Sequence, residues 1–476
     1  MIKEDFTMAM LKPIDRFQIG CAMLSAGRGF RSAIAAKHQI TRRYAYTLMH
    51  NVERIIKQYR DESITDVLPL TDLSMDRAIL SLAMDCHASL EGIQDALLNQ
   101  YNYSVSISTI SRKLSHYGQK ARQFLEAVDL SGIVTCAYDE VFQCGDLPIL
   151  GAICLDTHYI AELVCTPDRT AESWAITMSL LHYNQNLDFL FGVSDFGSGI
   201  LAGIPMVFPN AVMQGDVFHA LMELGEEIQK IENLAIKRLT SVADMQATAN
   251  PQKKTRERLA AELVTLDSYL IRADIANQLM TWLKEQLAFP GYYVHETKQN
   301  ILWILDEMDK IDGNVYKLHA KTATFRKRLD SILAYHTQLY SNLSSLSRKE
   351  NVSPTITSLL FRQSAEVKGS TVYKAIQRRL SRFDASDVEK AGNLIKGIIG
   401  MTHRASSMIE CTNSRLRKYI NAKHFLSNDF LALVRLYFNT KKLHRAEEKR
   451  MNASSLELLT GDKRNFFEIL GIPNVA

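Results

Sequence analysis

Apolar residues recur at three- and four-residue spacing over the first 130 positions, the period of helices that bury one face. Residues 31–39 form a short amphipathic segment. A longer one at 41–59 begins with Thr41, a residue type that caps helices. This outline fits a helix-turn-helix, whose second helix meets DNA through its N-terminal end. It fits a plain helical hairpin with a solvated basic face equally well. The residues at that end are Thr41, Arg42, Arg43 and Tyr44.

A second three-helix pattern follows, and its recurrence strengthens the first interpretation. It has helical segments at 75–86, 89–100 and 106–118, and the connector at 61–74 contains Pro, Asp and Ser. We therefore predict two helix-turn-helix domains, at 1–65 and 66–130. The last helix of the second carries the DNA-contact candidates Ser108, Thr109, Arg112 and Lys113.

The pattern changes to strands near residue 131. Three strand-like runs joined by short breaks predict an antiparallel meander, at 132–143, 147–156 and 158–166. A helix beginning at Thr170 and a strand ending near Asp195 come next, and residues 212–216 form a candidate fifth strand. A strand that follows a crossover helix usually lies parallel to its neighbour, so the predicted sheet is mixed.

Strand signals vanish between about 217 and 400, where long amphipathic runs predict an all-helical region. Trp282 and Trp303 lie there and are interpreted as core residues, with a DNA-stacking role as the alternative. Two further helices follow residue 403. The predicted fold class is therefore multidomain α plus α/β.

Composition narrows the class of protein. The 476 residues are 46% hydrophobic and 23% charged, and no run of about 18 apolar residues is present to span a bilayer. The first 20 residues lack the apolar core of a secretory signal, so we expect an intracellular protein with no membrane association. The seven cysteines form no CxxC pair, which argues against a zinc site or a disulfide framework.

The net charge of +4 is small but unevenly distributed. Residues 31–60 contain seven Lys or Arg and one acid, Glu53, and residues 404–450 contain eleven Lys or Arg and four acids. Basic zones of this kind suit a polyanion such as double-stranded DNA.

Three acidic residues occupy positions typical of metal ligands. Asp139 lies on the first predicted strand, Asp195 ends the strand after the crossover helix, and Glu410 begins a basic helix. Carboxylates from three elements can bind two Mg²⁺ ions that act on a phosphodiester.

Each acid also has a structural alternative. Asp139 can pair with a neighbouring cation, and Asp195 can cap a helix that starts at Phe196. Glu410 can complete a capping box with Ser407.

The stretches AYDEVFQ, SDFGSG, QGDVFH and SSMIECTNSRLRKYI, in this order behind a helix-turn-helix front, resemble bacterial insertion-sequence transposases of the DDE class. The resemblance covers residues from about 20 to 470. It implies an RNase H-like core in two parts, at 131–220 and 401–476, interrupted by a helical insertion at 221–400. It also implies that Asp139, Asp195 and Glu410 are the catalytic triad and the ligands of two Mg²⁺ ions, for which Mn²⁺ is expected to substitute.

The same resemblance assigns roles to neighbouring residues. Asp216 and His219 of QGDVFH are expected to support the site or contact DNA, and Asp216 would replace Asp195 if that assignment failed. Three residues share the helical face of Glu410 and are expected to contact the cut strand: Asn413, Ser414 and Arg417. Flanking phosphate contacts are expected from Arg415, Lys418 and Lys423, with a solvated basic helix as the alternative.

The implied function is that of a transposase, which binds terminal repeats, hydrolyses the DNA end and joins its 3′ hydroxyl to target DNA. A homodimer is expected in the synaptic complex, and a cytoplasmic, nucleoid-associated location in a bacterium. The alternatives are a non-catalytic DNA-binding relative and a nuclease that performs no strand transfer.

Overall fold

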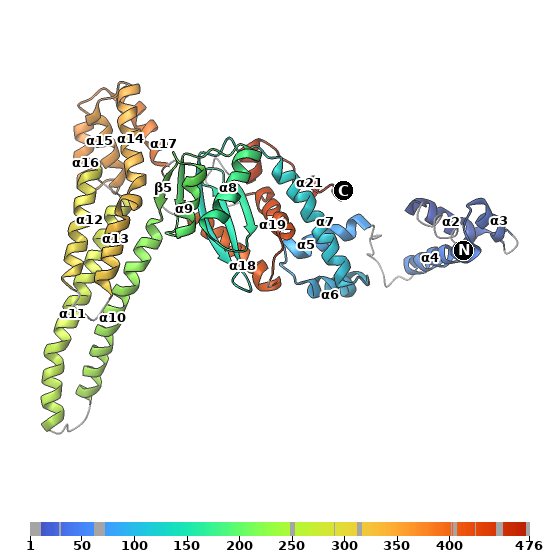
Figure 1. Cartoon of the computed structure of the whole chain (residues 1–476), viewed down its shortest axis with the longest axis horizontal. Coiled ribbons are helices and arrows are strands. Elements are labelled where there is room, and N and C mark those ends of the chain that lie inside the picture. The colour runs from blue at the N-terminus through green and yellow to red at the C-terminus, as the bar shows by residue number, and fades with distance from the viewer. Residues whose placement is uncertain are drawn as a thin grey trace. The chain divides into compact units, whose positions relative to one another are not determined.

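The computed structural model describes residues 11–27, 30–60, 72–247, 253–289, 291–311, 317–400, 402, 407–423, 425–443 and 451–472. The protein is mostly helical around one mixed five-stranded sheet, which confirms the α plus α/β class (Figure 1). It divides into two compact units. The first consists of residues 1–75 with 100–102, and the second of 76–99 with 103–476. Residues 61–71 of the predicted connector at 61–74 lie outside the described residues, and its last three residues, 72–74, are helical.

The first unit contains α2 (Pro13–Ser25), α3 (Arg31–Lys37) and α4 (Arg42–Arg60). Its core consists of Ile19, Met23, Ala35, Ala45, Leu48 and Met49. Gly20 lets α2 and α4 approach closely, because a Cβ at this position would lie 2.5 Å from Val52 Cγ2. The predicted cap is confirmed, since Thr41 Oγ1 accepts a hydrogen bond from Tyr44 N at 3.2 Å.

The sheet of the second unit has the strand order β3-β2-β1-β4-β5. Its strands are β1 (Thr135–Phe142), β2 (Pro148–Cys154), β3 (Ile160–Cys165), β4 (Phe191–Ser194) and β5 (Val212–Gly215). β1, β2 and β3 form the predicted antiparallel meander, and β4 and β5 join β1 in parallel. The mixed sheet expected from the crossover helix is therefore confirmed.

The two faces of the sheet are covered by different helices. α8 (Ala171–Gln185) and α9 (Ser198–Val207) lie on one face, where Trp174 packs edge-on against Tyr138 at a centroid distance of 5.9 Å. α18 (Ser407–Lys423) packs on the other face, against β1 and β2. Alternation along β1 consequently points Tyr138 toward α8 and Asp139 toward α18.

Both outer strands of the sheet are covered, which prevents pairing with other chains. Along β3, α19 (Asn428–Thr440) pairs the backbone of Ile160 with Asn439 and that of Cys165 with Asn428, at 2.8–3.2 Å. Beside β5, Gln214 accepts from Tyr335 N at 2.6 Å and donates to the Ile332 carbonyl at 2.7 Å.

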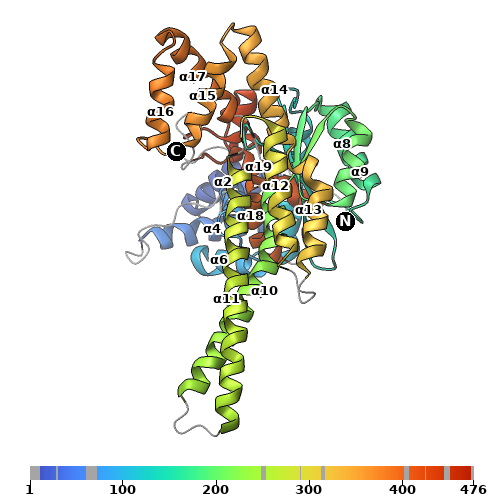
Figure 2. The ribbon, with the colours of Figure 1, turned by 90° about the vertical axis from the view of Figure 1, so that its left-hand side faces the viewer.

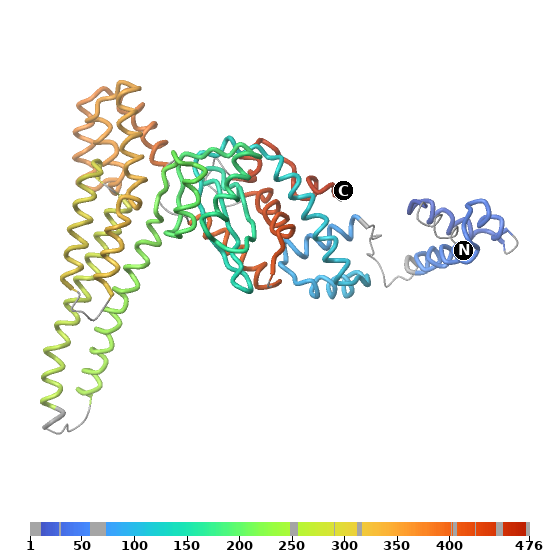
Figure 3. Tube along the Cα trace, in the orientation of Figure 1, coloured from blue at the N-terminus to red at the C-terminus, as the bar shows by residue number. Residues whose placement is uncertain are grey.

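The all-helical region predicted between residues 217 and 400 is present, and the chain passes from β5 directly into it (Figure 3). α10 (Val217–Ala247) and α11 (Lys253–Ala288) run side by side as a long hairpin (Figures 1 and 2). The remaining helices of the region are α12 (Val294–Asp309), α13 (Leu318–Ile332), α14 (Ala334–Lys349), α15 (Pro354–Ala365), α16 (Thr371–Leu380) and α17 (Ala385–Gly400). The four helices α14, α15, α16 and α17 share one hydrophobic core.

Trp282 and Trp303, predicted to be core residues, instead stack on each other with exposed fractions of 40% and 51%.

The helices α5 (Asp72–Met84), α6 (Leu90–Tyr101) and α7 (Ile107–Glu126) differ from the expected separate domain at 66–130. From Asp76 onward most of this segment belongs to the same compact unit as the sheet. The physical reason is that α7 packs along α19, where Ser115 and Arg122 donate to the Asp429 carboxylate. Two short helices complete the chain, α20 (Ser455–Thr460) and α21 (Phe466–Ile469).

We predict that Gly118→Ala destabilises the second unit by about 1–3 kcal/mol, the usual cost of overpacking. A Cβ at Gly118 would lie 2.3 Å from the Asp429 carbonyl oxygen, so α7 and α19 would have to separate. The measurement is urea unfolding. Gly392→Ala is the matched control, because no atom lies within 4 Å of its Cβ position in α17, and it is expected to stabilise by about 0.5–1 kcal/mol. Equal effects of the two substitutions would contradict the packing argument.

Candidate functional site

Three aspartates lie just beyond the last parallel pairs of three neighbouring strands, where β4 and β5 end and β1 continues to Phe142. The parallel register pairs Tyr138 with Ser194, and Ser194 with Gly215. The next residue of each strand is an aspartate: Asp139, Asp195 and Asp216. Side chains at equivalent positions of parallel strands point to the same side, so the register brings these three carboxylates to one edge of the sheet.

Asp139 is held on both carboxylate oxygens. Its Oδ1 accepts from Glu140 N at 2.8 Å and its Oδ2 accepts from the Asn413 side-chain amide at 2.6 Å. Burial raises the pKa of Asp139 to about 6, and the nearby charges of Asp195 and Glu410 also raise it, against the Glu140 N–H and His219, which lower it. Asp139 is therefore close in space to both other members of the predicted triad.

Asp195 lies just before α9. The predicted alternative was a cap for a helix starting at Phe196, but α9 begins at Ser198 with Gly197 at the N-cap. Asp195 Oδ1 accepts from Gly197 N at 3.0 Å, so one oxygen fixes the turn and the carboxylate remains beside the site.

Glu410 reaches the same place from α18. Its Oε1 lies 3.4 Å from His219 Nε2 and is a buried atom with no hydrogen bond among the described residues. α18 begins at Ser407, and the preceding residues 403–406 lie outside the described residues. The side chain is thus directed at His219. Glu410 Oε1 makes no capping hydrogen bond among the described residues.

His219 connects Glu410 to the third strand-end aspartate. Its Nδ1 lies 3.3 Å from Asp216 Oδ2, and Asp216 is fully buried. Bonding to Asp216 raises the pKa of His219 to about 9; burial opposes this, while the charges of Glu410 and Asp195 add to it. A cation therefore separates two of the carboxylates.

The tightest set of potential metal ligands is Asp216, His219 and Glu410, not the predicted triad. Within the described part of the chain, these three alone offer ligand atoms that all lie within 4.8 Å of one another. Asp139 and Asp195 are electrostatically coupled to this set but are not part of it. Asp216 and His219, expected only to support the site, are thus at its centre.

A pocket of about 380 Å³ opens beside Asp195 and His219. Its walls include Arg169, which ion-pairs with Glu140 at 3.0 Å, and Arg328, which ion-pairs with Glu223 at 2.9 Å. The Arg328 guanidinium also lies 4.1 Å from the centre of the Phe196 ring. Sequence reasoning missed both arginines, since Arg328 comes from α13 in the helical region and no motif links it to the strands.

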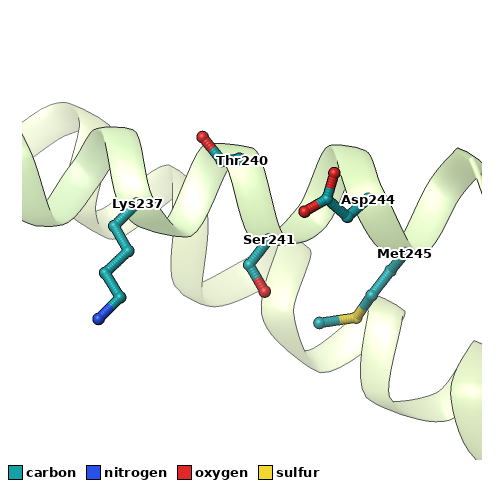
Figure 4. A pocket seen from close by; sticks show the side chains of 5 residues that line it. All are labelled: Lys237, Thr240, Ser241, Asp244 and Met245. Atoms are coloured by element: carbon teal, nitrogen blue, oxygen red, sulfur yellow. The ribbon is translucent and has the colours of Figure 1, made fainter.

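A larger hollow, of about 570 Å³, lies elsewhere (Figure 4). Among the described residues, those that line it belong to α10: Lys237, Thr240, Ser241, Asp244 and Met245. Lys237 is about 30 Å along the helix from Val217 at a rise of about 1.5 Å per residue. This hollow therefore does not belong to the carboxylate site.

The predicted DNA contacts on α18 fall into three groups. Ser414, Arg417 and Lys418 are exposed and available to a ligand. Arg415 packs its guanidinium 3.8 Å from the centre of the Phe438 ring, and Lys423 lies 4.9 Å from that of Phe430. Burial lowers the pKa of Lys423 to about 8, and its Nζ has no hydrogen-bond partner in the described part of the chain. Asn413 is buried on Asp139, so it positions a carboxylate and does not face DNA.

Among the candidates in the first unit, Arg42 and Arg43 are exposed at the start of α4. Thr41 is used as the cap, and Tyr44 packs against the core. Sequence reasoning missed Tyr46. The guanidinium carbons of Arg31 and Arg42 lie 5.7 and 5.9 Å from the centre of its ring.

In α7, the N-cap is Ser106, and Ser108 and Thr109 follow it in the first turn. Arg112 is exposed and donates to Thr109 Oγ1 at 3.2 Å. Lys113 instead forms an ion pair with Asp76, which also accepts from Tyr117 Oη at 2.7 Å. Lys113 therefore stabilises the packing of α5 on α7. Its ammonium group is paired with Asp76, so the structure does not support its predicted contact with DNA.

No family model and no curated protein matches the sequence. None of the helices in the described ranges has the length and apolar character needed to cross a membrane.

We predict that Asp139→Asn changes how stability depends on pH. The raised pKa means that the folded protein binds more protons than the unfolded chain between about pH 4 and 6, so wild-type stability falls as pH rises through this window. The difference in free energy of unfolding between the variant and wild type should shift in favour of the variant by up to about 3 kcal/mol between pH 4 and 7. His219 is present in both proteins, so the loss of its own contribution, which begins as pH rises through its unfolded pKa of 6.5, is common to the two profiles. Urea unfolding with a chelator present measures the difference, and parallel pH profiles for the two proteins would refute the effect of burial on Asp139.

Proposed function

We propose that this protein is a DDE-class transposase that cleaves DNA ends and joins them to target DNA. The observation that carries the proposal is that three carboxylates converge: Asp139 from β1, Asp195 from the end of β4 and Glu410 from α18. They are close enough that the charges of Asp195 and Glu410 add to the effect of burial in raising the pKa of Asp139. Burying several ionised carboxylates this close together costs free energy, and a divalent cation bound by their oxygens offsets the repulsion between them.

The fold supports the same proposal. We assign the mixed sheet with α8, α9 and α18 to an RNase H-like core, and α10 to α17 to the insertion that separates Asp195 from Glu410. We assign α3 and α4 to a helix-turn-helix, because a short turn joins them and exposed arginines begin the second helix. The start of α7, with Ser108, Thr109 and Arg112, is a second candidate surface for DNA.

The residues present fit divalent cations. Glu410 Oε1 is buried without a hydrogen bond among the described residues, and burial, together with the charges of Asp195 and Glu410, disfavours ionisation of Asp139. A cation bound by these carboxylates would satisfy both. Mg²⁺ held here supplies Lewis-acid activation of the attacking hydroxyl and stabilises the leaving oxygen, and Mn²⁺ has a similar ligand preference.

The chain's own residues orient the reaction. Asn413 fixes the Asp139 carboxylate, and the packing of α18 on β1 and β2 delivers Glu410. Arg169 and Arg328 line the pocket beside Asp195, and a phosphate bound there would share these guanidiniums with Glu140 and Glu223, the carboxylates they pair with. End hydrolysis and strand joining both attack phosphorus in line, once with water and once with the 3′ hydroxyl, so one site serves both.

A synaptic homodimer is part of the proposal, because two DNA ends must be handled together. The rival functions are a DNA-binding protein without catalysis and a nuclease without strand transfer. Incubation with DNA carrying inverted repeats from the flanks of the gene separates them. Transposition gives joined products, a nuclease gives cut ends only, and a binding protein gives neither.

We predict that Asp195→Asn and Glu410→Gln each lower Mg²⁺-dependent cleavage of such DNA by at least about 10³-fold. Both substitutions remove a charge from the proposed metal ligands without altering the exposed arginines of α4. Gel-shift affinity for the same DNA should consequently remain within about threefold of wild type. The matched control is Glu172→Gln, which removes an acid in the first turn of α8 and should cleave normally. Cleavage retained in Glu410→Gln would remove that residue from the proposed catalytic set.

We predict that replacing Arg42 and Arg43 together by Gln weakens DNA binding and reduces its salt dependence. Each lost phosphate contact lowers the slope of log affinity against log salt by about 0.9, so the double variant should lose nearly 2. Fluorescence anisotropy between 50 and 200 mM salt measures this slope. Lys57→Gln is the control, because Lys57 lies about 22 Å further along α4 and pairs with Glu53 at 3.4 Å. An unchanged slope in the double variant would rule out this end of α4 as the DNA contact.

A further inference from the structure

His219 lies between two carboxylates in an arrangement that its position in the sequence alone does not explain. Nδ1 faces Asp216 Oδ2 at 3.3 Å and Nε2 faces Glu410 Oε1 at 3.4 Å. The two ring nitrogens therefore have different partners, one from the end of β5 and one from α18.

Asp216 is fixed more firmly than Glu410. Its Oδ1 accepts from Phe218 N at 2.6 Å and His219 N at 3.3 Å in the first turn of α10, and its side chain is fully buried. The other oxygen faces the imidazole. Histidines that bind metals commonly donate their second ring N–H to a carboxylate, which sets the tautomer and the ring orientation.

The Glu410 side has the opposite character. Glu410 Oε1 is a buried atom with no hydrogen bond in the described part of the chain. On the Asp216 side of the ring, the 3.3 Å contact of Nδ1 with Asp216 Oδ2 is close but is not aligned as a hydrogen bond. Ligand atoms of Asp216, His219 and Glu410 lie within 4.8 Å of one another, so a small adjustment of side chains places one cation between His219 and Glu410.

We propose that His219 Nε2 is a ligand of the cation bound by Glu410, with Asp216 holding the imidazole through Nδ1–H. This rests on the proposed function only in taking Glu410 as a metal ligand. Binding requires the neutral ring, so the proton on Nε2 of the imidazolium is released to solvent and Nδ1–H is kept. The alternative is an ion pair in which protonated His219 only bridges two carboxylates.

The proposal gives the two cation positions different chemistry. Asp139 and Asp195 offer only oxygen, which suits Mg²⁺, whereas imidazole nitrogen with a carboxylate favours a transition metal such as Mn²⁺ or Co²⁺. We therefore expect the site formed by His219 Nε2 and the Glu410 carboxylate to bind one transition-metal ion more tightly than it binds Mg²⁺.

The test is direct measurement of Mn²⁺ binding to the full-length protein without DNA. Electron spin echo modulation of bound Mn²⁺ should show coupling to an imidazole nitrogen in wild type and lose it in His219→Gln. The Mn²⁺ dissociation constant should rise at least about tenfold in His219→Gln and about 10–100-fold in Asp216→Asn, the usual range for a lost supporting carboxylate. Glu172→Gln, at an exposed position in the first turn of α8, is the control, and it should keep the nitrogen signal.

The outcomes separate this inference from the proposed function. Absence of the nitrogen signal in wild type, or its persistence in His219→Gln, overturns the role of His219, whether or not that variant is stable. DNA cleavage that depends on Asp139 and Asp195 would then still support the transposase. A nitrogen signal that depends on His219, in a protein that cleaves no DNA, would support the metal ligand and count against the transposase.

Discussion

Electrostatic crowding where the parallel pairing of β1, β4 and β5 ends is the constraint to which the rest of the second unit responds. The strand register brings three aspartates to one edge, and α18 adds Glu410. Like charges in a partly buried place repel, so each needs a compensating group. Asn413 and the Glu140 N–H serve Asp139, the Gly197 N–H serves Asp195, and His219 lies between Asp216 and Glu410. Burial, with the charges of Asp195 and Glu410, still keeps the pKa of Asp139 raised, and a bound divalent cation would favour its ionised form.

The helical region between Asp195 and Glu410 is fixed to the sheet at a specific place. Gln214 of β5 exchanges hydrogen bonds with the junction of α13 and α14, and Ser331 donates to the Met213 carbonyl at 3.3 Å. The last strand is therefore covered, and α13 is placed so that Arg328 enters the pocket beside Asp195. An insertion in the sequence thus contributes a cation to the site, which a spacer with no contact to the sheet could not do.

The positions of the strands and the direction of the sheet could be predicted because each depends on local patterns: alternation, breaks and a crossover helix. The closeness of Asp139 and Asp195 follows from the same topology. The buried role of Asn413 could not be predicted, because helical spacing places it on the face of Glu410 without saying whether that face meets DNA or the sheet. The pairing of Lys113 with Asp76 and the entry of Arg328 also depend on contacts between distant segments. His219 was noticed through its motif, but only the structure places Glu410 on its second nitrogen.

Under the proposed function, recognition of DNA by α7 and the placement of Glu410 are mechanically connected. Tyr419 of α18 donates to the Met84 carbonyl of α5 at 2.7 Å, and Asp429 of α19 accepts from Ser115 and Arg122 of α7. The Tyr419 contact is buried and the two Asp429 contacts are partly buried, and close-packed interiors transmit strain. A displacement of α7 on DNA would therefore be transmitted to α18, and with it to the one carboxylate of the site that is carried by a helix. The strand-borne aspartates are fixed by the sheet, so Glu410 is the ligand whose position DNA binding can alter.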